Sequence, residues 1–295
     1  RAERIKNGSV IIEKKEIRIA FENDKPIKPY YKEPLSTNKL VEEFMLLANK
    51  YVCEYYNKKF IGIYRIHDYP DMEKLEYVKK FLATMEITFN YNNKNLASKI
   101  NTLLTKVKSE NCKYIINQLV LNSMSKAEYS TKNIGHFGLG FEKYSHFTSP
   151  IRRYPDLLAH RQLNYIIEKE NAITTNLEDL CKISSKKERN AIKAERDYMK
   201  FLLLWLIKDK KDTETQATIT SVKEWGVYAE LNEYFCEGLI PLSYLRKTGN
   251  YYYNNTKNEI IDKKNGKSLF LGKNISVVIE NIDLMKYELD LTLLI

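Results

Sequence analysis

The hydrophobic positions divide the chain into two parts of different periodicity. In the first part, apolar residues recur every three or four positions, which predicts helices over about 36–56, 71–85, 95–106, 109–125, 154–168 and 176–210. After about residue 213 the pattern changes to short β-branched and aromatic runs separated by turns, the clearest being Thr215–Val222, Val227–Leu231, Gly238–Ile240, Ile275–Ile282 and Glu288–Leu293. The pattern predicts an α+β chain, mostly helical over residues 1–212 and a β domain over residues 213–295.

The first 35 residues have an extended character. Asn7-Gly8 is a turn signal, and Val10–Phe21 is rich in β-branched and aromatic residues, which favours short strands. The helix that follows begins at Ser36. Its apolar stripe has helical spacing and leaves Glu42 and Glu43 off the centre of the stripe; its members are Leu40, Val41, Phe44, Leu47, Ala48, Tyr51 and Val52.

The net charge of +10 indicates a polyanionic partner, with nucleic acid first and an anionic membrane surface second. The lysine excess could also reflect translation of an AT-rich genome. No apolar run approaches the ~18 residues of a membrane span. The four cysteines (Cys53, Cys112, Cys181 and Cys236) are far apart and form neither a zinc pattern nor a disulfide framework. We expect buried thiols, a cytoplasmic protein and, because the chain starts at Arg1, a piece of something longer.

The segment His146-Phe-Thr-Ser-Pro-Ile-Arg-Arg-Tyr-Pro-Asp156 carries the strongest chemical signal. Arg152 and Arg153 follow each other in a stretch expected to be extended, so their side chains should point to opposite sides. One can then face a phosphate, which suits the planar guanidinium fork, while the other packs inside. Ser149 offers a hydroxyl, and a helix start just downstream adds positive potential. The alternative is a loop leading into a helix, held by a structural Arg–Asp pair.

This segment resembles the most specific motif of the RNase II/RNase R (RNB) exoribonucleases. Further motifs of that family follow in the same order along the chain: Leu40-Val-Glu-Glu-Phe-Met-Leu-Leu-Ala-Asn49, Arg65-Ile-His-Asp-Tyr-Pro70, Gly135-His-Phe-Gly-Leu-Gly140 and Ala194-Glu-Arg-Asp197. The resemblance covers nearly the whole chain. It implies the C-terminal half of an RNB catalytic domain over residues 1–212, followed by a five-stranded OB-fold β-barrel that binds RNA.

The resemblance also implies an activity and roles for individual residues. Family members hydrolyse RNA processively from its 3′ end to nucleoside monophosphates, with Mg²⁺ held by aspartates. Arg152 would contact the scissile phosphate, and Glu195 would hold the sugar of the 3′-terminal nucleotide. Glu42 or Glu43 would do likewise. A sugar contact is one way to prefer RNA to DNA.

Other polar features of the first part have more ordinary interpretations. Glu195 could be a surface acid paired one helical turn away, and Glu42 and Glu43 could be solvated. His67, Asp68 and Asp71 could suggest a metal site, but Asp-x-Pro-Asp favours a turn. The glycines at 135–140 lack the spacing of a dinucleotide fingerprint, so we interpret them as backbone passing close to something, for example an RNA channel.

The β domain contains candidates for RNA contact. Trp225 and Tyr228 can stack on bases, and Lys223 can serve phosphates. Alternatively the two aromatic side chains fill the barrel, because an odd spacing along a strand need not place both outside unless Gly226 forms a bulge. The insert Asn250–Thr256 is a further stacking candidate.

No aspartate cluster of the family is recognised in the sequence. We therefore expect no metal ligand in this chain, with the Mg²⁺ ligands elsewhere in a parent protein and the chain alone inactive. The leading hypothesis is part of a 3′→5′ exoribonuclease that acts on single-stranded RNA 3′ ends, with an RNA helicase or another RNA-decay protein as partner and without membrane association. The alternatives are a truncated RNA-binding fragment without catalysis and a protein-interaction piece.

Overall fold

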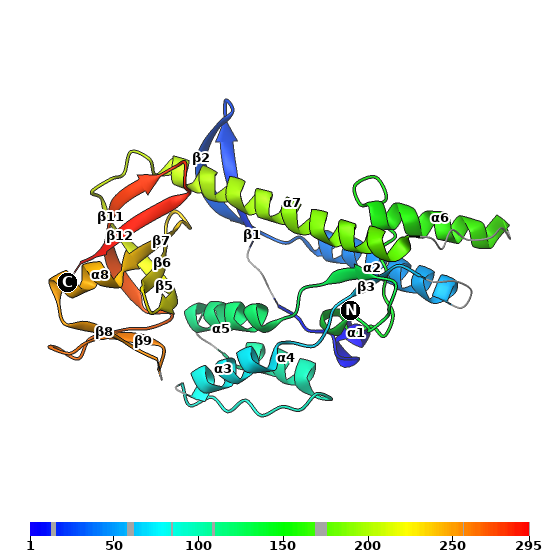
Figure 1. Ribbon diagram of the computed structural model, residues 1–295, viewed down its shortest axis with the longest axis horizontal. Coiled ribbons are helices and arrows are strands. Elements are labelled where there is room, and N and C mark those ends of the chain that lie inside the picture. The colour runs from blue at the N-terminus through cyan, green and yellow to red at the C-terminus, as the bar shows by residue number, and fades with distance from the viewer. Residues whose placement is uncertain are drawn as a thin grey trace. The chain divides into compact units, whose positions relative to one another are not determined.

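The computed structural model describes residues 1–12, 16–57, 62–83, 85–107, 110–168, 176–255 and 257–294 (Figure 1). The chain forms two compact units. The first comprises Arg1–Lys14, Glu33–Lys108 and Ile116–Ala191, and the second comprises Lys15–Lys32, Ser109–Ile115 and Ile192–Ile295. The predicted α+β class, mostly helical and then barrel, is confirmed.

The first unit is built from helices around a small sheet. Its elements are α1 (Ala2–Lys6), α2 (Ser36–Asn57), β3 (Tyr64–Ile66), α3 (Met72–Ala83), α4 (Leu96–Lys106), most of α5 (Glu110–Ser123), β4 (Glu128–Ser130), the 3-10 turn η1 (Phe137–Leu139), α6 (Tyr154–Glu168) and the first half of α7 (Leu177–Leu206). Strands β3 and β4 pair antiparallel. Apolar faces of α3, α4 and α5 close one core around Leu75, Ile100 and Ile116, all fully buried. The helices predicted from periodicity are therefore present at nearly the predicted bounds.

Helix α2 buries a different face from the one that its apolar stripe suggests. Phe44 is 63% exposed and Tyr51 is 59% exposed, whereas Cys53 and the polar Asn49 are buried. Apolar spacing identifies a helix, but it does not identify which face the rest of the described chain covers.

The glycines of the 135–140 segment pack against the chain's own N-terminal segment. A Cβ at Gly140, whose φ is +66°, would lie 2.7 Å from the backbone nitrogen of Ser9 and 2.9 Å from the carbonyl carbon of Gly8. The Ser9 hydroxyl and the Val10 N–H both donate to the Gly138 carbonyl. The close approach that we expected is therefore present at Gly140, but its partner is residues 8–10 of this chain and not an RNA channel.

The second unit contains a closed five-stranded barrel. Its strands are β5 (Glu214–Lys223), β6 (Gly226–Leu231), β7 (Glu237–Pro241), β11 (Asn274–Asp283) and β12 (Glu288–Leu293), in the spatial order β11-β12-β7-β6-β5 with β11 pairing back to β5. Four pairings are antiparallel, and β12 with β7 is parallel. This order is that of an OB-fold. All five strands contain the runs predicted from the sequence.

The barrel carries two additions. Helix α8 (Leu242–Thr248) and a three-stranded sheet of β8 (Tyr251–Asn254), β9 (Glu259–Asp262) and β10 (Ser268–Leu269) lie between β7 and β11. Tyr251, expected as part of a stacking surface, is buried in the core, while Lys263 lies over the ring of Tyr252. Thr256 of that expected surface lies outside the described residues.

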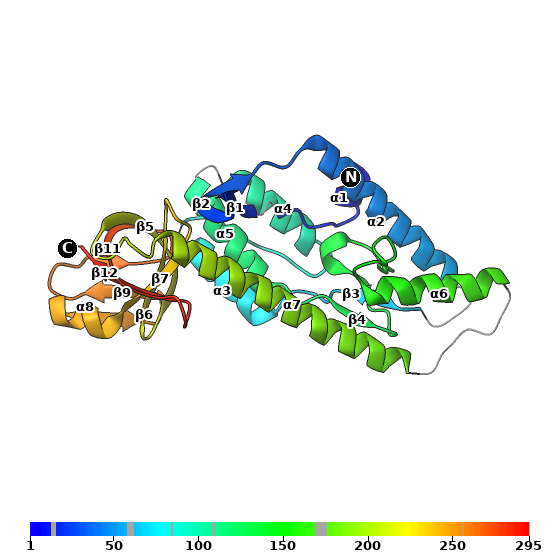
Figure 2. The ribbon, with the colours of Figure 1, turned by 90° about the horizontal axis from the view of Figure 1, so that it is seen from above.

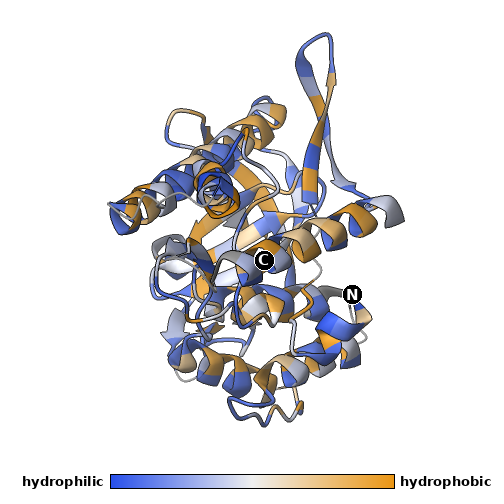
Figure 3. Ribbon diagram, turned by 90° about the vertical axis from the view of Figure 1, so that its right-hand side faces the viewer, coloured by the Kyte–Doolittle hydropathy of each residue, from blue (hydrophilic) through white to orange (hydrophobic). Residues whose placement is uncertain are grey.

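The second addition is the hairpin of β1 (Glu16–Glu22) and β2 (Lys25–Lys32), in which hydrophobic and hydrophilic residues alternate (Figure 3). Ile17 and Ile19 pack against the barrel core, and the rings of Tyr31 and Phe235 lie 4.5 Å apart. The hairpin therefore belongs to the same compact unit as the barrel. The barrel begins near the boundary expected at 213, but this unit also draws on two earlier stretches of the chain.

Helix α7 is one uninterrupted helix of 30 residues (Figure 2). Its first half packs on the β3–β4 pair, because the Arg65 guanidinium donates to both carboxylate oxygens of Glu188 at 2.6 and 3.0 Å and Arg189 pairs with Glu128. Among the described residues, no helix has the length and apolar character needed to cross a membrane.

Candidate RNA-binding site on the first unit

The segment with the strongest chemical signal forms a tight turn at the start of α6. Pro150–Arg152 turns, and the N–H groups of Arg152 and Arg153 both donate to the Ser149 carbonyl, at 3.3 and 3.0 Å. The prediction of an extended stretch is therefore wrong at this point. The reason is a local side-chain contact: the fully buried Asp156 carboxylate accepts from the Ser149 N–H at 2.8 Å and holds the turn closed.

The two arginines nevertheless have different surroundings. The Arg153 guanidinium donates to both oxygens of Asp156, at 2.9 and 2.7 Å, so the predicted Arg–Asp pair exists. Arg152 is exposed, and its one hydrogen bond among the described residues is a long contact of 3.4 Å to the Ser149 hydroxyl. Arg153 is thus fixed, whereas Arg152 can turn its guanidinium to a ligand.

Asn49 connects helix α2 to this turn. Its side chain is buried, and Oδ1 accepts from the backbone N–H groups of Phe147 and Thr148 at 2.9 and 3.1 Å. Its Nδ2 donates to the Tyr144 hydroxyl at 2.9 Å. One amide therefore satisfies three polar groups and sets the distance between α2 and the arginine-bearing segment. Asn49 was not predicted as a site residue, although it is the last residue of the motif that begins at Leu40.

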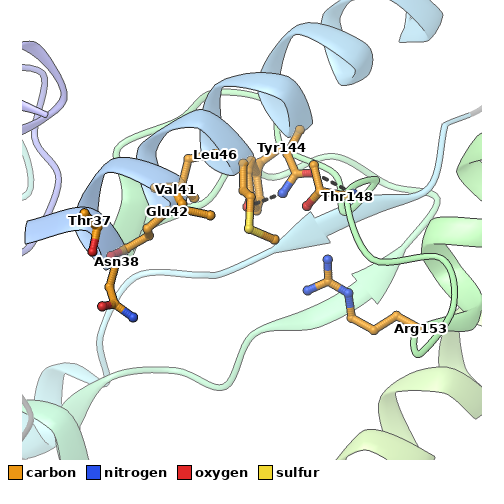
Figure 4. Close-up of a pocket in the computed structure, with 10 residues that line it drawn as sticks. Thr37, Asn38, Val41, Glu42, Leu46, Tyr144, Thr148 and Arg153 are labelled. Atoms are coloured by element: carbon orange, nitrogen blue, oxygen red, sulfur yellow. Dashed lines mark hydrogen bonds between the residues drawn. The ribbon is translucent and has the colours of Figure 1, made fainter. Parts of the chain in front are cut away.

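A pocket of about 450 Å³ lies between α2 and this segment. Figure 4 shows Glu42 and Asn38 on the α2 side and the guanidinium of Arg153 on the opposite side. Its lining residues are Thr37, Asn38, Val41, Glu42, Met45, Leu46, Asn49, Tyr144, Thr148 and Arg153. The Thr148 hydroxyl is buried without a hydrogen-bond partner among the described residues. The pocket thus offers a hydroxyl, a carboxylate and a fixed cation to a ligand.

The two glutamates of α2 have different environments. Glu42 is exposed and lines the pocket. Glu43 forms an ion pair with Arg4 and lies 3.7 Å from the terminal amine, and hydrogen bonding to Arg4 lowers the pKa of its carboxyl. The arrangement brings Glu42, and not Glu43, to the pocket. Two adjacent helix residues differ by about 100° in direction, and only the position of Arg4 decides which of them is engaged.

The Tyr144 ring, which lines the pocket, packs against His136 and His146. Burial, with repulsion from Arg153 second, lowers the pKa of His146 to about 2, and burial followed by His67 lowers that of His136 to about 3. The Tyr144 ring lies edge-on to both imidazoles at 5.5 and 5.6 Å. The low pKa values favour the uncharged form of both histidines. His146 forms a hydrogen bond with the Tyr129 hydroxyl through Nδ1, and His136 accepts from the Leu139 N–H.

The alternative metal interpretation at 67–71 finds no support in the geometry. The Asp71 carboxylate accepts from the N–H groups of Glu73 and Lys74 and so caps α3. His67 accepts from the Gly138 N–H through Nδ1. Among the described residues no group of three or more His, Cys, Asp or Glu side chains is arranged to hold a metal ion. In the pocket, Glu42 is the one carboxylate among the lining residues, so the groups present do not fit a divalent-metal site.

The remaining predicted residues lie in the second unit. Glu195 is exposed on α7 and forms no ion pair with a described residue. Lys223 ends β5 and is exposed; Trp225 is 57% exposed, and its indole N–H donates to the Tyr228 hydroxyl at 3.3 Å. Trp225 sits in the turn before β6, so strand alternation does not govern it, and both rings lie outside the barrel core. The alternative that both fill the barrel is wrong.

The first unit has an exposed arginine on a turn next to a pocket, and the second unit has an OB barrel that presents aromatic side chains. Each of these features is typical of nucleic-acid-binding proteins. A family model for the RNB domain matches residues 1–169. The chain belongs to this family, that of RNase II and RNase R.

Individual relatives agree with this assignment. Ribonuclease R of Thermotoga maritima is 33% identical over 304 residues, covering 99% of this chain and 42% of the relative. Ribonuclease R of Escherichia coli is 29% identical over 307 residues, covering 99% and 38%. The apo structure of Mycoplasma genitalium RNase R matches with a TM-score of 0.91 at 26% identity, over 99% of this chain and 47% of that one. The chain thus spans less than half the length of these relatives.

Proposed function

We propose that this chain is the RNA-holding part of a hydrolytic 3′→5′ exoribonuclease that degrades RNA to nucleoside monophosphates. The observation that carries the proposal is the turn at 149–153. It exposes the Arg152 guanidinium, while the next residue, Arg153, lines a pocket in which the Thr148 hydroxyl has no hydrogen-bond partner among the described residues. Support also comes from the Mycoplasma genitalium RNase R bound to ribose-methylated single-stranded RNA, which matches with a TM-score of 0.90 at 26% identity and 99% coverage of this chain.

In this proposal each residue has a separate role. Arg152 contacts the scissile phosphate and stabilises the charge that develops in the transition state. Arg153 and Ser149 shape the phosphate-binding turn, and Glu42 contacts the sugar of a 3′-terminal nucleotide in the pocket. For Glu195, on the second unit, we also propose a contact with an RNA sugar. Glu43 acts through Arg4 to fix the N-terminal segment and does not touch RNA.

Family members use Mg²⁺, which polarises the phosphate and activates water. Because the residues of the pocket do not fit such an ion, we propose that its ligands lie outside this chain and that the chain alone does not hydrolyse RNA. We also propose that the parent protein acts in the cytoplasm, with an RNA helicase or another RNA-decay protein as partner.

A binding assay tests the first part of the proposal. Purified chain should bind fluorescent single-stranded RNA, with an affinity that falls as salt rises, and should release no mononucleotides in the presence of Mg²⁺. Release of mononucleotides by the chain alone would show that the proposed division of the active site is wrong.

A substitution in the parent protein tests the catalytic role. Arg152→Ala should lower turnover at least 100-fold, comparable to the loss of one transition-state donor, while RNA affinity changes by less than about fivefold. Arg161→Ala, an exposed arginine on α6, is the matched control and should change neither. Equal losses of turnover and affinity in Arg152→Ala would remove the transition-state role. A parent that binds RNA and never hydrolyses it would support the non-catalytic alternative.

A further inference from the structure

Helix α7 separates its charges between faces. Six basic residues follow one another at alternating intervals of four and three positions: Lys182, Lys186, Arg189, Lys193, Arg196 and Lys200. At about 100° per residue, this spacing places all six within a stripe about 80° wide. All six are exposed. Because α7 is one helix, its own periodicity fixes these side chains relative to one another.

Of the five acidic residues of α7, Glu178 lies at the start of the helix, in line with the basic stripe, where its carboxylate accepts from the N–H and the hydroxyl of Thr131. Glu188 points to Arg65 on β3, and Glu195 follows it by seven positions, on the same side of the helix. Asp179 and Asp197 border the basic stripe, and Asp179 pairs with Lys182 at 3.6 Å. Among the stripe residues only Lys182 and Arg189 form ion pairs within the described part of the chain. Lys186, Lys193, Arg196 and Lys200 therefore have no described acidic partner.

Such an arrangement is unfavourable for an isolated solvated helix. Like charges three or four residues apart repel each other and destabilise the helix, whereas surface helices usually gain from alternating Glu–Lys pairs. A polyanion laid along the stripe removes this repulsion. The stripe from Lys182 to Lys200 is about 27 Å long, with one cation about every 5 Å, so it can face several consecutive phosphates.

We propose that this basic stripe is a second RNA-binding surface, which holds the phosphate backbone independently of base sequence. The ligand chemistry is that of a run of phosphates, because lysine acts as a point charge and the stripe contains no aromatic residue for stacking. None of the six stripe residues lines the pocket at α2. The stripe proposal extends the proposed function, and it rests on that function because it takes RNA as the ligand.

The test compares two triple variants of equal charge. Lys186→Gln with Lys193→Gln and Lys200→Gln removes three unpaired cations of the stripe. Lys187→Gln with Lys80→Gln and Lys99→Gln removes three exposed lysines elsewhere, Lys187 being on another face of α7. Both triples lower the net charge from +10 to +7. Glutamine has a helix propensity close to that of lysine, so circular dichroism should show both variants folded.

Fluorescence anisotropy on single-stranded RNA at several salt concentrations gives the readout. In the stripe variant, the slope of log affinity against log salt should become less steep by about 2, since each phosphate contact on a single strand contributes about 0.7. Affinity at 100 mM salt should fall about tenfold or more. The control triple should change the slope by less than about 0.5. A triple variant with Lys186→Arg, Lys193→Arg and Lys200→Arg keeps the charge and should retain the wild-type slope.

Equal slopes in the stripe and control variants would overturn the proposal. It would also be overturned if the stripe variant bound RNA as well as the wild-type chain does but no longer bound anionic phosphatidylserine vesicles. Trp225→Ala separates this outcome from failure of the proposed function. If Trp225→Ala weakens RNA binding and the stripe variant does not, the stripe is wrong and the function stands. If the wild-type chain does not bind RNA, the proposed function fails.

Discussion

At the scale of single residues, Asn49 matters more than its plain amide suggests. Its side chain is buried, and its three hydrogen bonds tie α2 to the segment that bears both arginines. A buried N–H without a partner costs more than the bond itself gains. The geometry of the pocket therefore depends on a residue with no charge and no role in chemistry.

Replacing Asn49 tests this dependence. Asn49→Leu should lower the free energy of unfolding by about 2–4 kcal/mol, since it leaves two buried backbone N–H groups unpaired. Asn49→Asp keeps the acceptor and loses the donor, so its loss should be smaller. Urea denaturation measures the energy, and hydrogen exchange of the Phe147 and Thr148 amides should accelerate in the leucine variant. Unchanged exchange at these two amides would show that Asn49 does not hold the segment.

For two adjacent residues, the sequence does not show which one is held by a partner and which one is open to a ligand. The motif around Arg152 and the two glutamates of α2 were identified from the sequence, but the partner of each was not. Glu43 forms an ion pair with Arg4, which lies 39 positions earlier. The Asp156 carboxylate holds the turn at 150–152 through the Ser149 N–H. The contact between Arg4 and Glu43 depends on the tertiary arrangement, which neighbouring residues do not encode.

At the scale of elements, the local sequence pattern predicted most of the longer helices and all strands of the barrel. Helix bounds and all five barrel strands follow from periods of 3.6 and 2, which each segment carries in itself. Two features did not follow. The buried face of α2 depends on what packs against it. The strands β8–β10 were not among the predicted runs, and only β8 lies in the insert expected as a stacking surface. The partner of the 135–140 segment could not be predicted either, because residues 8–10 are about 130 positions away in the sequence.

The docking of the N-terminal segment on Gly140 gives a prediction at this scale. Gly140→Ala places a methyl group 2.7 Å from the Ser9 nitrogen in a left-handed conformation, so it should destabilise the first unit by about 2 kcal/mol or more. Gly8→Ala is the control: φ is +98° there, but nothing lies within 4 Å of the added carbon. It should cost about 1 kcal/mol. Thermal unfolding followed by circular dichroism compares them, and equal losses would mean that the close approach is not specific.

At the scale of the whole molecule, the two units can be followed separately, because both tryptophans, Trp205 and Trp225, belong to the second unit. That unit also holds Glu230, which lies opposite Glu237 in the β6–β7 pairing and accepts from the Tyr114 hydroxyl at 3.5 Å. Burial, with repulsion from Glu237 second, raises the pKa of Glu230 to about 7. A barrel-specific pH dependence of stability follows from this one carboxyl group.

The sign of that dependence is fixed by the direction of the shift. The folded chain keeps the proton on Glu230 up to about pH 7, whereas the unfolded chain loses it near pH 4.5. The stabilising contribution of the protonated group is therefore complete below about pH 4.5 and is lost as pH rises to about 7. Glu230→Gln mimics the protonated form, so it should stabilise the second unit by up to about 3 kcal/mol at pH 8 and by almost nothing at pH 4.

Tryptophan fluorescence during urea unfolding at pH 4 and pH 8 measures the difference. Glu237→Gln removes only the second cause of the shift and should give a smaller gain at pH 8. Glu288→Gln, an exposed residue of β12, should leave the pH dependence as it is. Because no tryptophan lies in the first unit, the fluorescence change reports the barrel unit alone. A gain from Glu230→Gln that is equal at both pH values would mean that packing, and not the proton, sets the stability of this unit.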